Sequence, residues 1–300
     1  MTSLRLAALL VVPLWLAGCG DDSGTPTADS GAMPDTGSES GTDPSSEADG
    51  DTESGDDGST TAGETVDSTG SAACTPADGD PVQELVTLTS DDGKALTGVV
   101  TRPTTGSCLP AVVLIHQFGN DKSQWDGELA AFVARGYVTL AIDLRGHGES
   151  DPQDGAFNGL LTDPDQAPLD VQAAIAHLAN DAAVDSSRIG VVGTSIGANL
   201  AVVAASQDLG VAATVAISAR LDPVESLLGG AAVSVGPLLC FAGETDGGGD
   251  QAMTCSALEP LSSGPAMSVI LPGTAAHGVA IVDMFPETFP AVLDFLDANV

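Results

Sequence analysis

The sequence predicts an α/β fold with a doubly wound, mostly parallel sheet over residues 74–300. Short apolar runs typical of buried strands alternate with helix-forming segments throughout this part of the chain. Strands that alternate with helices pair in parallel through right-handed crossovers. The segment is also long enough for one domain with a full hydrophobic core. We therefore expect one α/β domain here.

The domain is expected to open with an antiparallel hairpin. Residues 84–89 and 96–102 alternate apolar and polar side chains around the turn Asp91-Asp92-Gly93, as two paired strands do. Residues 111–115 are continuously apolar, which is typical of a strand buried on both faces. The remaining predicted strands lie over 137–142, 189–192, 211–217, 235–241 and 267–271. The predicted helices lie over 123–135, over 167–179, from Ser195 and, at the end, over 287–299, and a short helix is expected after each of the strands over 211–217 and 235–241.

Residues 1–19 have the features of an export signal. Arg5 precedes an apolar core over 6–16, which is shorter than the roughly 20 apolar residues of a membrane span. The segment ends in Leu16-Ala17-Gly18-Cys19, which resembles a bacterial lipobox. We expect a lipoprotein signal peptide, export to the bacterial cell envelope and a membrane anchor through lipidated Cys19. An ordinary secretory signal with an incidental cysteine is the alternative.

Residues 20–73 are predicted to form a disordered acidic tether. They are rich in Asp, Glu, Ser, Thr, Gly and Pro and contain no Lys or Arg, so they cannot bury enough apolar surface to fold. The whole chain has 42 Asp and Glu against 8 Lys and Arg, a formal net charge of −34. Nucleic acid is therefore excluded as a partner, because binding to phosphates needs clustered cations.

Four cysteines follow Cys19 and allow three disulfide pairings. We favour Cys74 with Cys108, which both lie in loop-like sequence beside the first strands. We also favour Cys240, which lies in a buried run, with Cys255 on the next helix. Four free thiols are the alternative. The spacing fits neither a zinc site nor a redox pair, and no metal is expected.

The strongest functional signal is the stretch from Arg188 to Val203. An apolar run over 189–192 leads into Gly193-Thr-Ser195-Ile-Gly197, and a helix-forming run follows at once. A strand-to-helix reversal this tight places strained backbone angles on the serine and leaves no room for side chains at the flanking glycines. The serine hydroxyl would lie at a helix N-terminus, where free N–H groups stabilise negative charge. Ser195 is therefore predicted to be a nucleophile.

A general base and an orienting acid are expected on later loops. His277 follows the predicted strand over 267–271, and Asp246 follows the strand over 235–241. A neutral imidazole takes the serine proton, and the carboxylate orients the ring and stabilises its charged form. Asp222 and then Asp250 are the alternative acids. His116 is interpreted as structural, beneath the loop that follows residues 111–115, and Asp143 is expected to pair with Arg145.

Two backbone N–H groups are expected to stabilise the oxyanion of the reaction. One belongs to Ile196, directly after the serine, and the other to Phe118 in the loop after residues 111–115. Such donors are each worth about 3–4 kcal/mol of transition-state stabilisation.

Together these motifs resemble those of serine-nucleophile α/β-hydrolases, closest to the dienelactone-hydrolase-like esterase group. The resemblance implies the α/β-hydrolase fold, hydrolysis of a small-molecule carboxylic ester through an acyl-enzyme, and no cofactor. Gln117 departs from the family, which often has glycine there. True dienelactone hydrolases use a cysteine nucleophile, so their lactone specificity is not carried over to Ser195. The motifs are His116-Gln-Phe-Gly119, Asp143-Leu-Arg-Gly-His-Gly148-Glu-Ser150, Gly193-Thr-Ser-Ile-Gly197, Gly243-Glu-Thr-Asp246 and Pro272-Gly-Thr-Ala-Ala-His277-Gly278.

The substrate pocket is expected to be open. The segment between residues 217 and 235 has room for one short helix and not for a large lid domain. Two other functions compete with the esterase hypothesis. One is an amidase, peptidase or acyltransferase that uses the same triad, and the other is a non-catalytic α/β-hydrolase-like binding protein. The sequence does not indicate an oligomeric state.

Overall fold

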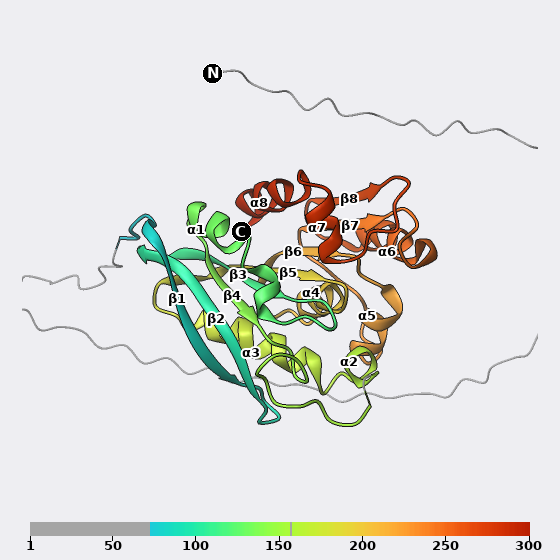
Figure 1. Cartoon of the computed structure of the whole chain (residues 1–300), viewed down its shortest axis with the longest axis horizontal. Helices are drawn as coiled ribbons and strands as arrows, with labels where there is room; N and C mark the ends of the chain where they lie inside the picture. Colours follow the sequence, from blue (N-terminus) through green and yellow to red (C-terminus); the bar gives the residue numbers. More distant parts are fainter. Residues whose placement is uncertain (1–72, 157) are drawn as a thin grey trace, which may run out of the picture. The chain divides into compact units, whose positions relative to one another are not determined.

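The computed structural model describes residues 73–156 and 158–300 (Figure 1). The predicted signal peptide, the tether and the lipidation site at Cys19 lie outside the described residues. Within the described ranges, no helix has the length and apolar character needed to cross a membrane.

The described residues form an eight-stranded sheet in the order β1-β2-β4-β3-β5-β6-β7-β8. The antiparallel pairs are β1 with β2 and β2 with β4, and every other neighbouring pair is parallel. The predicted α/β fold with a mostly parallel sheet is thereby confirmed. The strands are β1 (Asp78–Thr89), β2 (Ala95–Thr105), β3 (Leu109–Ile115), β4 (Val138–Ile142), β5 (Val184–Thr194), β6 (Val211–Ile217), β7 (Leu238–Gly243) and β8 (Ala266–Leu271).

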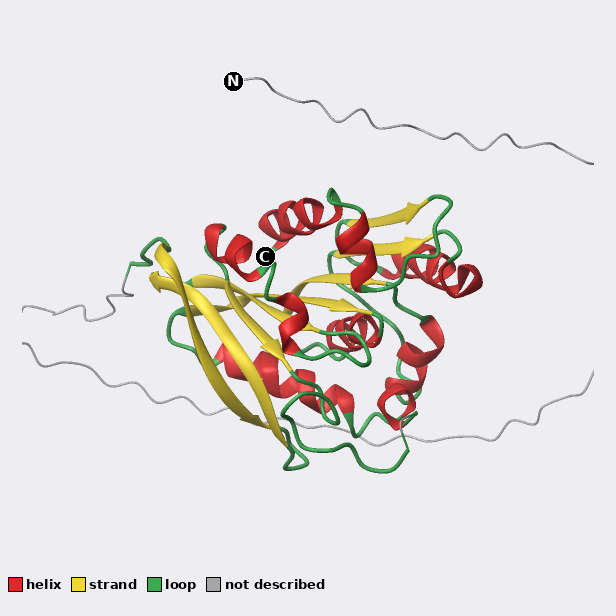
Figure 2. Ribbon diagram, in the orientation of Figure 1, coloured by secondary structure: helices red, strands yellow, loops and turns green. Residues whose placement is uncertain are grey.

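Helices cover both faces of the sheet (Figure 2). Side chains of β3 alternate between two apolar cores, with Val113 in one and Val112 and Leu114 in the other. The helices of the first core are α3 (Ala167–Ala179), α4 (Ile196–Ser206), α5 (Leu221–Leu227) and α6 (Asp250–Leu258), and the short α2 (Gly159–Thr162) adds Leu160. The helices of the second core are α1 (Leu129–Ala134), α7 (Val279–Met284) and α8 (Thr288–Asn299).

Several elements differ from the sequence prediction at their ends. Strand β1 begins at Asp78, because its mostly exposed first half is held by backbone pairing with β2 rather than by burial. The helix expected over 123–135 is divided into a 3₁₀ turn over Lys122–Trp125 and the short α1. Strand β7 begins only after Gly236 and Pro237, and proline has no N–H for a strand ladder. The short helices α2 and α7 were not predicted.

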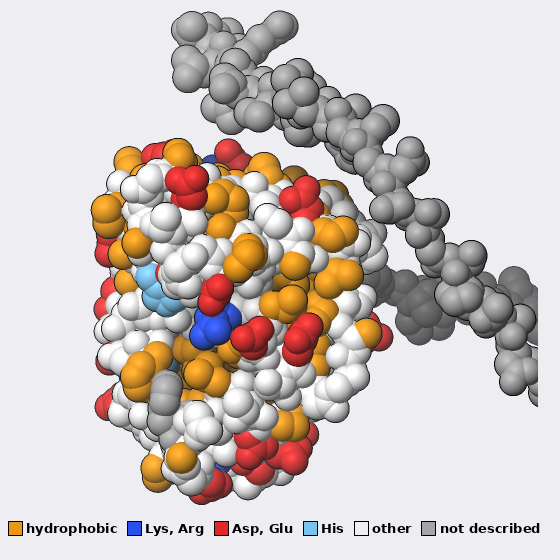
Figure 3. Space-filling model, turned by 90° about the vertical axis from the view of Figure 1, so that its right-hand side faces the viewer, with side chains coloured by type: hydrophobic (Ala, Val, Ile, Leu, Met, Phe, Trp, Pro, Cys, Tyr) orange, Lys and Arg blue, Asp and Glu red, His pale blue; other side chains and the backbone are white. Residues whose placement is uncertain are grey.

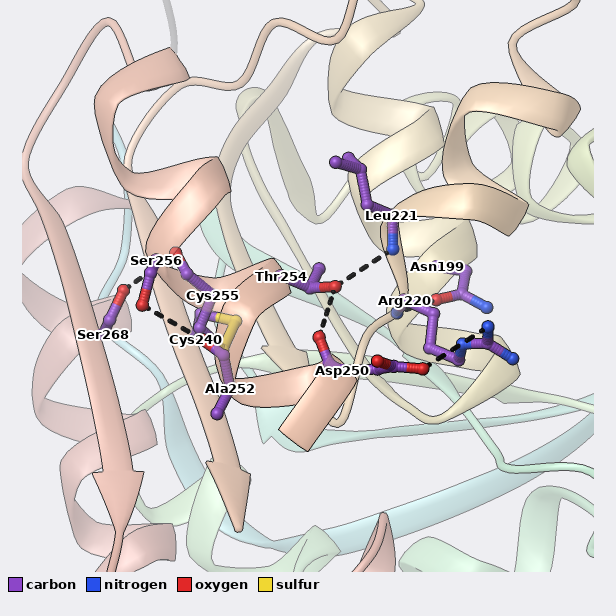
Figure 4. Close-up of a disulfide and its surroundings, with 10 residues drawn as sticks. All are labelled: Asn199, Arg220, Leu221, Cys240, Asp250, Ala252, Thr254, Cys255, Ser256 and Ser268. Atoms are coloured by element: carbon purple, nitrogen blue, oxygen red, sulfur yellow. Dashed lines mark hydrogen bonds and ion pairs between the residues drawn. A yellow bond between two sulfur atoms is a disulfide. The ribbon is translucent and has the colours of Figure 1, made fainter. Parts of the chain in front are cut away.

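Two disulfides link Cys74 to Cys108 and Cys240 to Cys255, each with a Cα–Cα distance of 5.4 Å. These are the pairings that the sequence analysis favours. The first connects the start of the described domain to the segment before β3. The second connects β7 to α6, as Figure 4 shows. It encloses the loop that contains Asp246.

A buried arginine connects the loop after β4 to α3 and to the turn between β1 and β2. Arg145 is fully buried and donates from Nε and Nη2 to Asp170 Oδ1 on α3, at 2.9 and 2.7 Å. It also donates to both carboxylate oxygens of Asp92 in the β1–β2 turn, at 2.7 and 3.1 Å. The hydrogen bonds from Arg145 lower the pKa of Asp92 to about 2.

The predicted pair of Asp143 with Arg145 is therefore wrong. The Asp143 carboxylate instead accepts from the ammonium of Lys122 at 2.8 Å and from the backbone N–H groups of Lys122 and Glu149. Proximity in sequence is a poor guide here, because the loop turns the two side chains toward different elements.

Asp170→Asn is expected to lower the free energy of unfolding by about 3 kcal/mol, because it leaves the buried Arg145 charge with one carboxylate less. Urea denaturation at neutral pH would measure this. The control is Asp294→Asn, which breaks an exposed ion pair with Arg135 and should cost less than about 1 kcal/mol. Equal losses in the two variants would contradict the importance given to the buried pair.

Candidate active site

Close backbone packing forms a sharp turn at Ser195, between β5 and α4. The serine has φ 54° and ψ −113°, a conformation that residues other than glycine rarely adopt. A Cβ atom at Gly193 would lie 2.0 Å from the carbonyl oxygen of Gly197, and one at Gly197 would lie 2.4 Å from that of Ile115. Only glycine fits at these two positions, as the sequence analysis expects.

Ser195, His277 and Asp246 lie in one hydrogen-bonded row. His277 Nε2 is 2.7 Å from Ser195 Oγ, and His277 Nδ1 is 2.8 and 3.0 Å from the two carboxylate oxygens of Asp246. Asp246 is buried, whereas the side chain of His277 is 42% exposed. The three residues follow the carboxyl ends of β5, β8 and β7, the edge where parallel sheets bind ligands.

The alternative acids lie elsewhere. Asp222 and Asp250 both approach the guanidinium of Arg220, at 3.4 and 3.8 Å, and the side chain of Asp222 is 85% exposed. Neither has a hydrogen bond to His277. Asp246 is thus the carboxylate that orients the histidine.

His116 is a buried structural residue. Its Nε2 accepts a hydrogen bond from the N–H of Leu144 at 3.1 Å, so its Nδ1 is the donor to the carbonyl oxygen of Gln117 at 2.7 Å. Burial lowers the pKa of His116 to about 4, which keeps the ring neutral near pH 7.

The two residues that are expected to supply the oxyanion donors line the same cavity. Ile196 is the first residue of α4, where backbone N–H groups have no partner within the helix. Phe118 lies in the loop after β3, and both residues line a cavity together with Ser195 and His277.

Gln117, the departure from the family pattern, joins two loops of this site. Its side-chain Oε1 accepts from the backbone N–H of Val279 at 2.9 Å, directly after the His277 loop. Its own backbone N–H donates to Gln124 Oε1 at 3.0 Å. The longer side chain therefore connects the loop of Phe118 to the loop of the histidine, a contact that the sequence analysis did not find.

The cavity at the triad has a volume of about 290 Å³. Its remaining apolar wall comes from Leu161 and Pro223, and its polar wall from Asn199, Ser218, Arg220 and Gln251. Figure 3 shows a face of the molecule on which a basic side chain lies among acidic ones, beside gathered apolar side chains. No sequence motif marks these polar wall residues, although Asn199 lies one helical turn after Ser195.

Within the described ranges, no group of three or more His, Cys, Asp or Glu side chains is arranged to hold a metal ion.

This fold and this site define a serine hydrolase of the α/β-hydrolase class. Residues 92–247 match the sequence profile of the X-Pro dipeptidyl-peptidase family, the S15 family. The match covers more than half of the chain, and the chain belongs to this family.

Two curated relatives match a shorter stretch. The uncharacterized protein YcjY of Escherichia coli (strain K12) is 36% identical over 110 residues, which are 36% of this chain and 35% of that protein. Quorum-quenching protein AidA of Acinetobacter baumannii (strain MDR-ZJ06) is 32% identical over 115 residues, 38% of this chain and 36% of that protein. The matched stretches thus span about a third of these relatives' length.

A solved structure supports the fold. The acetyl xylan esterase from Paenibacillus sp. R4 superposes with a TM-score of 0.60 at 21% identity, covering 74% of this chain and 85% of that one. At this identity the likeness bears on the fold alone.

Asp246→Asn is expected to reduce kcat by about three to four orders of magnitude, because an amide holds the histidine in the wrong tautomer. Steady-state hydrolysis of a chromogenic ester would measure this. Asp222→Asn is the control and should change kcat by less than about tenfold. The opposite ranking would assign the acid to Asp222.

Proposed function

We propose that this protein hydrolyses carboxylic esters, with Ser195 as nucleophile, His277 as general base and Asp246 as the orienting acid. The observation that carries the proposal is the contact of 2.7 Å between Ser195 Oγ and His277 Nε2, with Asp246 on the other ring nitrogen. An unmodified serine is a weak nucleophile, and a histidine at this distance takes its proton during attack.

The reaction proceeds in two halves. Ser195 Oγ attacks the ester carbonyl carbon while its proton passes to His277 Nε2, and the backbone N–H groups of Ile196 and Phe118 stabilise the oxyanion. The intermediate collapses to an acyl-enzyme, and His277 gives its proton to the departing alcohol. A water molecule then repeats the attack on the acyl-enzyme, which releases the acid and restores the serine.

Two observations favour esters. The motifs resemble those of dienelactone-hydrolase-like esterases, and one solved relative by fold is described as an acetyl xylan esterase. Membership of the X-Pro dipeptidyl-peptidase family favours a second candidate, peptide hydrolysis at the same serine. Assays of short-chain p-nitrophenyl esters beside an X-Pro p-nitroanilide separate the two, because the proposed esterase should turn over the esters far faster.

We also propose that the protein is an exported lipoprotein of the cell envelope. The support is the segment of residues 1–19, with its apolar core and its terminal Leu16-Ala17-Gly18-Cys19. The disulfides Cys74–Cys108 and Cys240–Cys255 are also typical of proteins in oxidising compartments.

Ser195→Ala is expected to abolish ester hydrolysis and to prevent labelling by a fluorophosphonate probe, because both need the activated hydroxyl. The fold should persist, as circular dichroism would show, since only one oxygen atom is removed. Substantial turnover by the purified variant would refute Ser195 as nucleophile. A wild-type protein that the probe does not label would favour the non-catalytic alternative.

Cys19→Ala is expected to prevent lipidation, because alanine has no thiol to carry the lipid. The protein expressed in a bacterial host should then fail to incorporate labelled fatty acid and should leave the membrane fraction. Cys74→Ala is the control for general loss of a cysteine and should still incorporate label. Membrane association that survives Cys19→Ala would count against the lipobox interpretation.

A further inference from the structure

Gln251 places its side-chain amide on the wall of the active-site cavity, and its Oε1 is buried without a protein partner. It lies in the first turn of α6, is 4% exposed and lines the same cavity as Ser195 and His277. Its Oε1 is one of six buried side-chain atoms in residues 73–156 and 158–300 without a hydrogen-bond partner. Of these six, it is the one that belongs to a cavity-lining residue. That oxygen is closed off against Gly247, whereas Nε2 is not among the buried atoms without a partner, so Nε2 is the group that a ligand can reach. A ligand oxygen that accepts from it gains about 0.5–1.5 kcal/mol.

The loop of the catalytic acid leaves space for this amide. A Cβ atom at Gly247 would lie 2.2 Å from Gln251 Oε1 and 2.8 Å from its Nε2. The amide therefore packs over the backbone of the residue next to Asp246. Any larger residue at position 247 would have to displace it.

Asn199 provides a second amide on this wall. Its Oδ1 accepts from the backbone N–H of Arg220 at 2.7 Å, which fixes the orientation of the side chain. Because that bond uses the acceptor, the Nδ2 group is the donor that Asn199 offers a ligand. The wall thus presents neutral hydrogen-bonding groups from α4 and α6 (Figure 4 shows Asn199 beside Arg220).

The charges at the cavity favour a neutral ligand. Arg220 lines the cavity, but its guanidinium lies near two carboxylates, those of Asp222 and Asp250. The three side chains together carry a net negative charge, which disfavours an anionic substrate. A charged group buried against the neutral Gln251 amide would lack a counter-ion, which is costly. A hydroxyl group can both donate to and accept from an amide without this cost.

We infer that Gln251 is a specificity-determining residue and that the substrates are neutral esters bearing a hydroxyl group near the ester bond. This inference rests on the proposed ester hydrolysis. A site built to hydrogen-bond a hydroxyl discriminates against analogues that lack it, because the amide is then left unpaired in the complex.

The test compares hydroxylated esters with plain ones. One pair carries the hydroxyl in the acyl part, p-nitrophenyl lactate against p-nitrophenyl propionate. The other carries it in the alcohol part, glycerol monobutyrate against propyl butyrate. Each kcat/KM is divided by the rate constant for alkaline hydrolysis of the same ester, which removes differences in intrinsic reactivity. The full-length wild-type protein should favour the hydroxylated member of at least one pair by about tenfold or more.

Gln251→Met keeps a similar volume and removes both polar atoms. It should reduce the preferred ratio to within about twofold of one, because the hydroxyl then has no amide to pair with. Gln166→Met is the control for the activity ratio, since Gln166 is also buried with an unpaired Oε1 but does not line this cavity. Its Nε2 donates to Asp163 Oδ2 at 2.9 Å, so it is not a control for stability. It should keep the wild-type ratio.

Thermal unfolding of Gln251→Met, compared with the wild-type protein, separates recognition from a structural role. Removing an amide that has no protein partner should leave the Tm of Gln251→Met unchanged or raise it. A Tm clearly below that of the wild-type protein would show that the amide serves the fold and would overturn the inference.

Ratios near one in both wild-type pairs, or a ratio that persists in Gln251→Met, would also overturn the inference. If plain esters were hydrolysed and Ser195 reacted with fluorophosphonate, the proposed function would stand without it. If no ester were hydrolysed and Ser195 did not react, the proposed function would fail as well.

Discussion

The close approach of backbone to backbone around Gly193 and Gly197 sets the position of Ser195 and of the start of α4. The carbonyl oxygens of Gly197 and Ile115 occupy the places where side chains would begin. As a result α4 starts directly above the ends of β3 and β5, and Ser195 is forced to a positive φ. The same packing brings the first N–H groups of α4 next to the loop that follows β3. The positions of Ser195 and of the Ile196 N–H therefore follow from one steric constraint.

His277 is held by polar contacts of the residues that follow it rather than by close packing. Gly278 donates from its backbone N–H to Ser218 Oγ at 2.9 Å, and Val279 donates to Gln117 Oε1. The loop of His277 is thus hydrogen-bonded to Ser218, directly after β6, and to Gln117 in the loop that follows β3. Because all of these strands run parallel, their ends meet at one edge, and residues far apart in sequence become neighbours. Asp246 lies in the segment after β7, and this position places its carboxylate beside the imidazole of His277.

Local patterns were sufficient for much of this architecture. The helix over 167–179 could be predicted from its run of helix-forming residues. Ser195 could be predicted from Gly193 and Gly197, because a tight strand-to-helix turn requires glycine on both sides of the serine. The partners of Arg145 could not, since Asp92 and Asp170 come from distant segments that folding brings together. The full length of β1 was missed because its exposed half has no apolar pattern. Gln251 carries no motif, and its place on the cavity wall depends on the tertiary arrangement of α6.

The cross-link between Cys240 and Cys255 also bears on how the enzyme withstands damage. The two cysteines have a sequence separation of 15, and the segment between them includes Asp246, Gln251 and the glycines of positions 247–249, of which Gly247 and Gly248 are exposed. Exposed glycine-rich turns are preferred sites of proteolytic cleavage. A cut there would leave two polypeptides still joined through sulfur, with β7 on one and α6 on the other. The fragment carrying the histidine could not diffuse away from the fragment carrying the serine and the acid, so the nicked molecule keeps every group of the site within one covalent body.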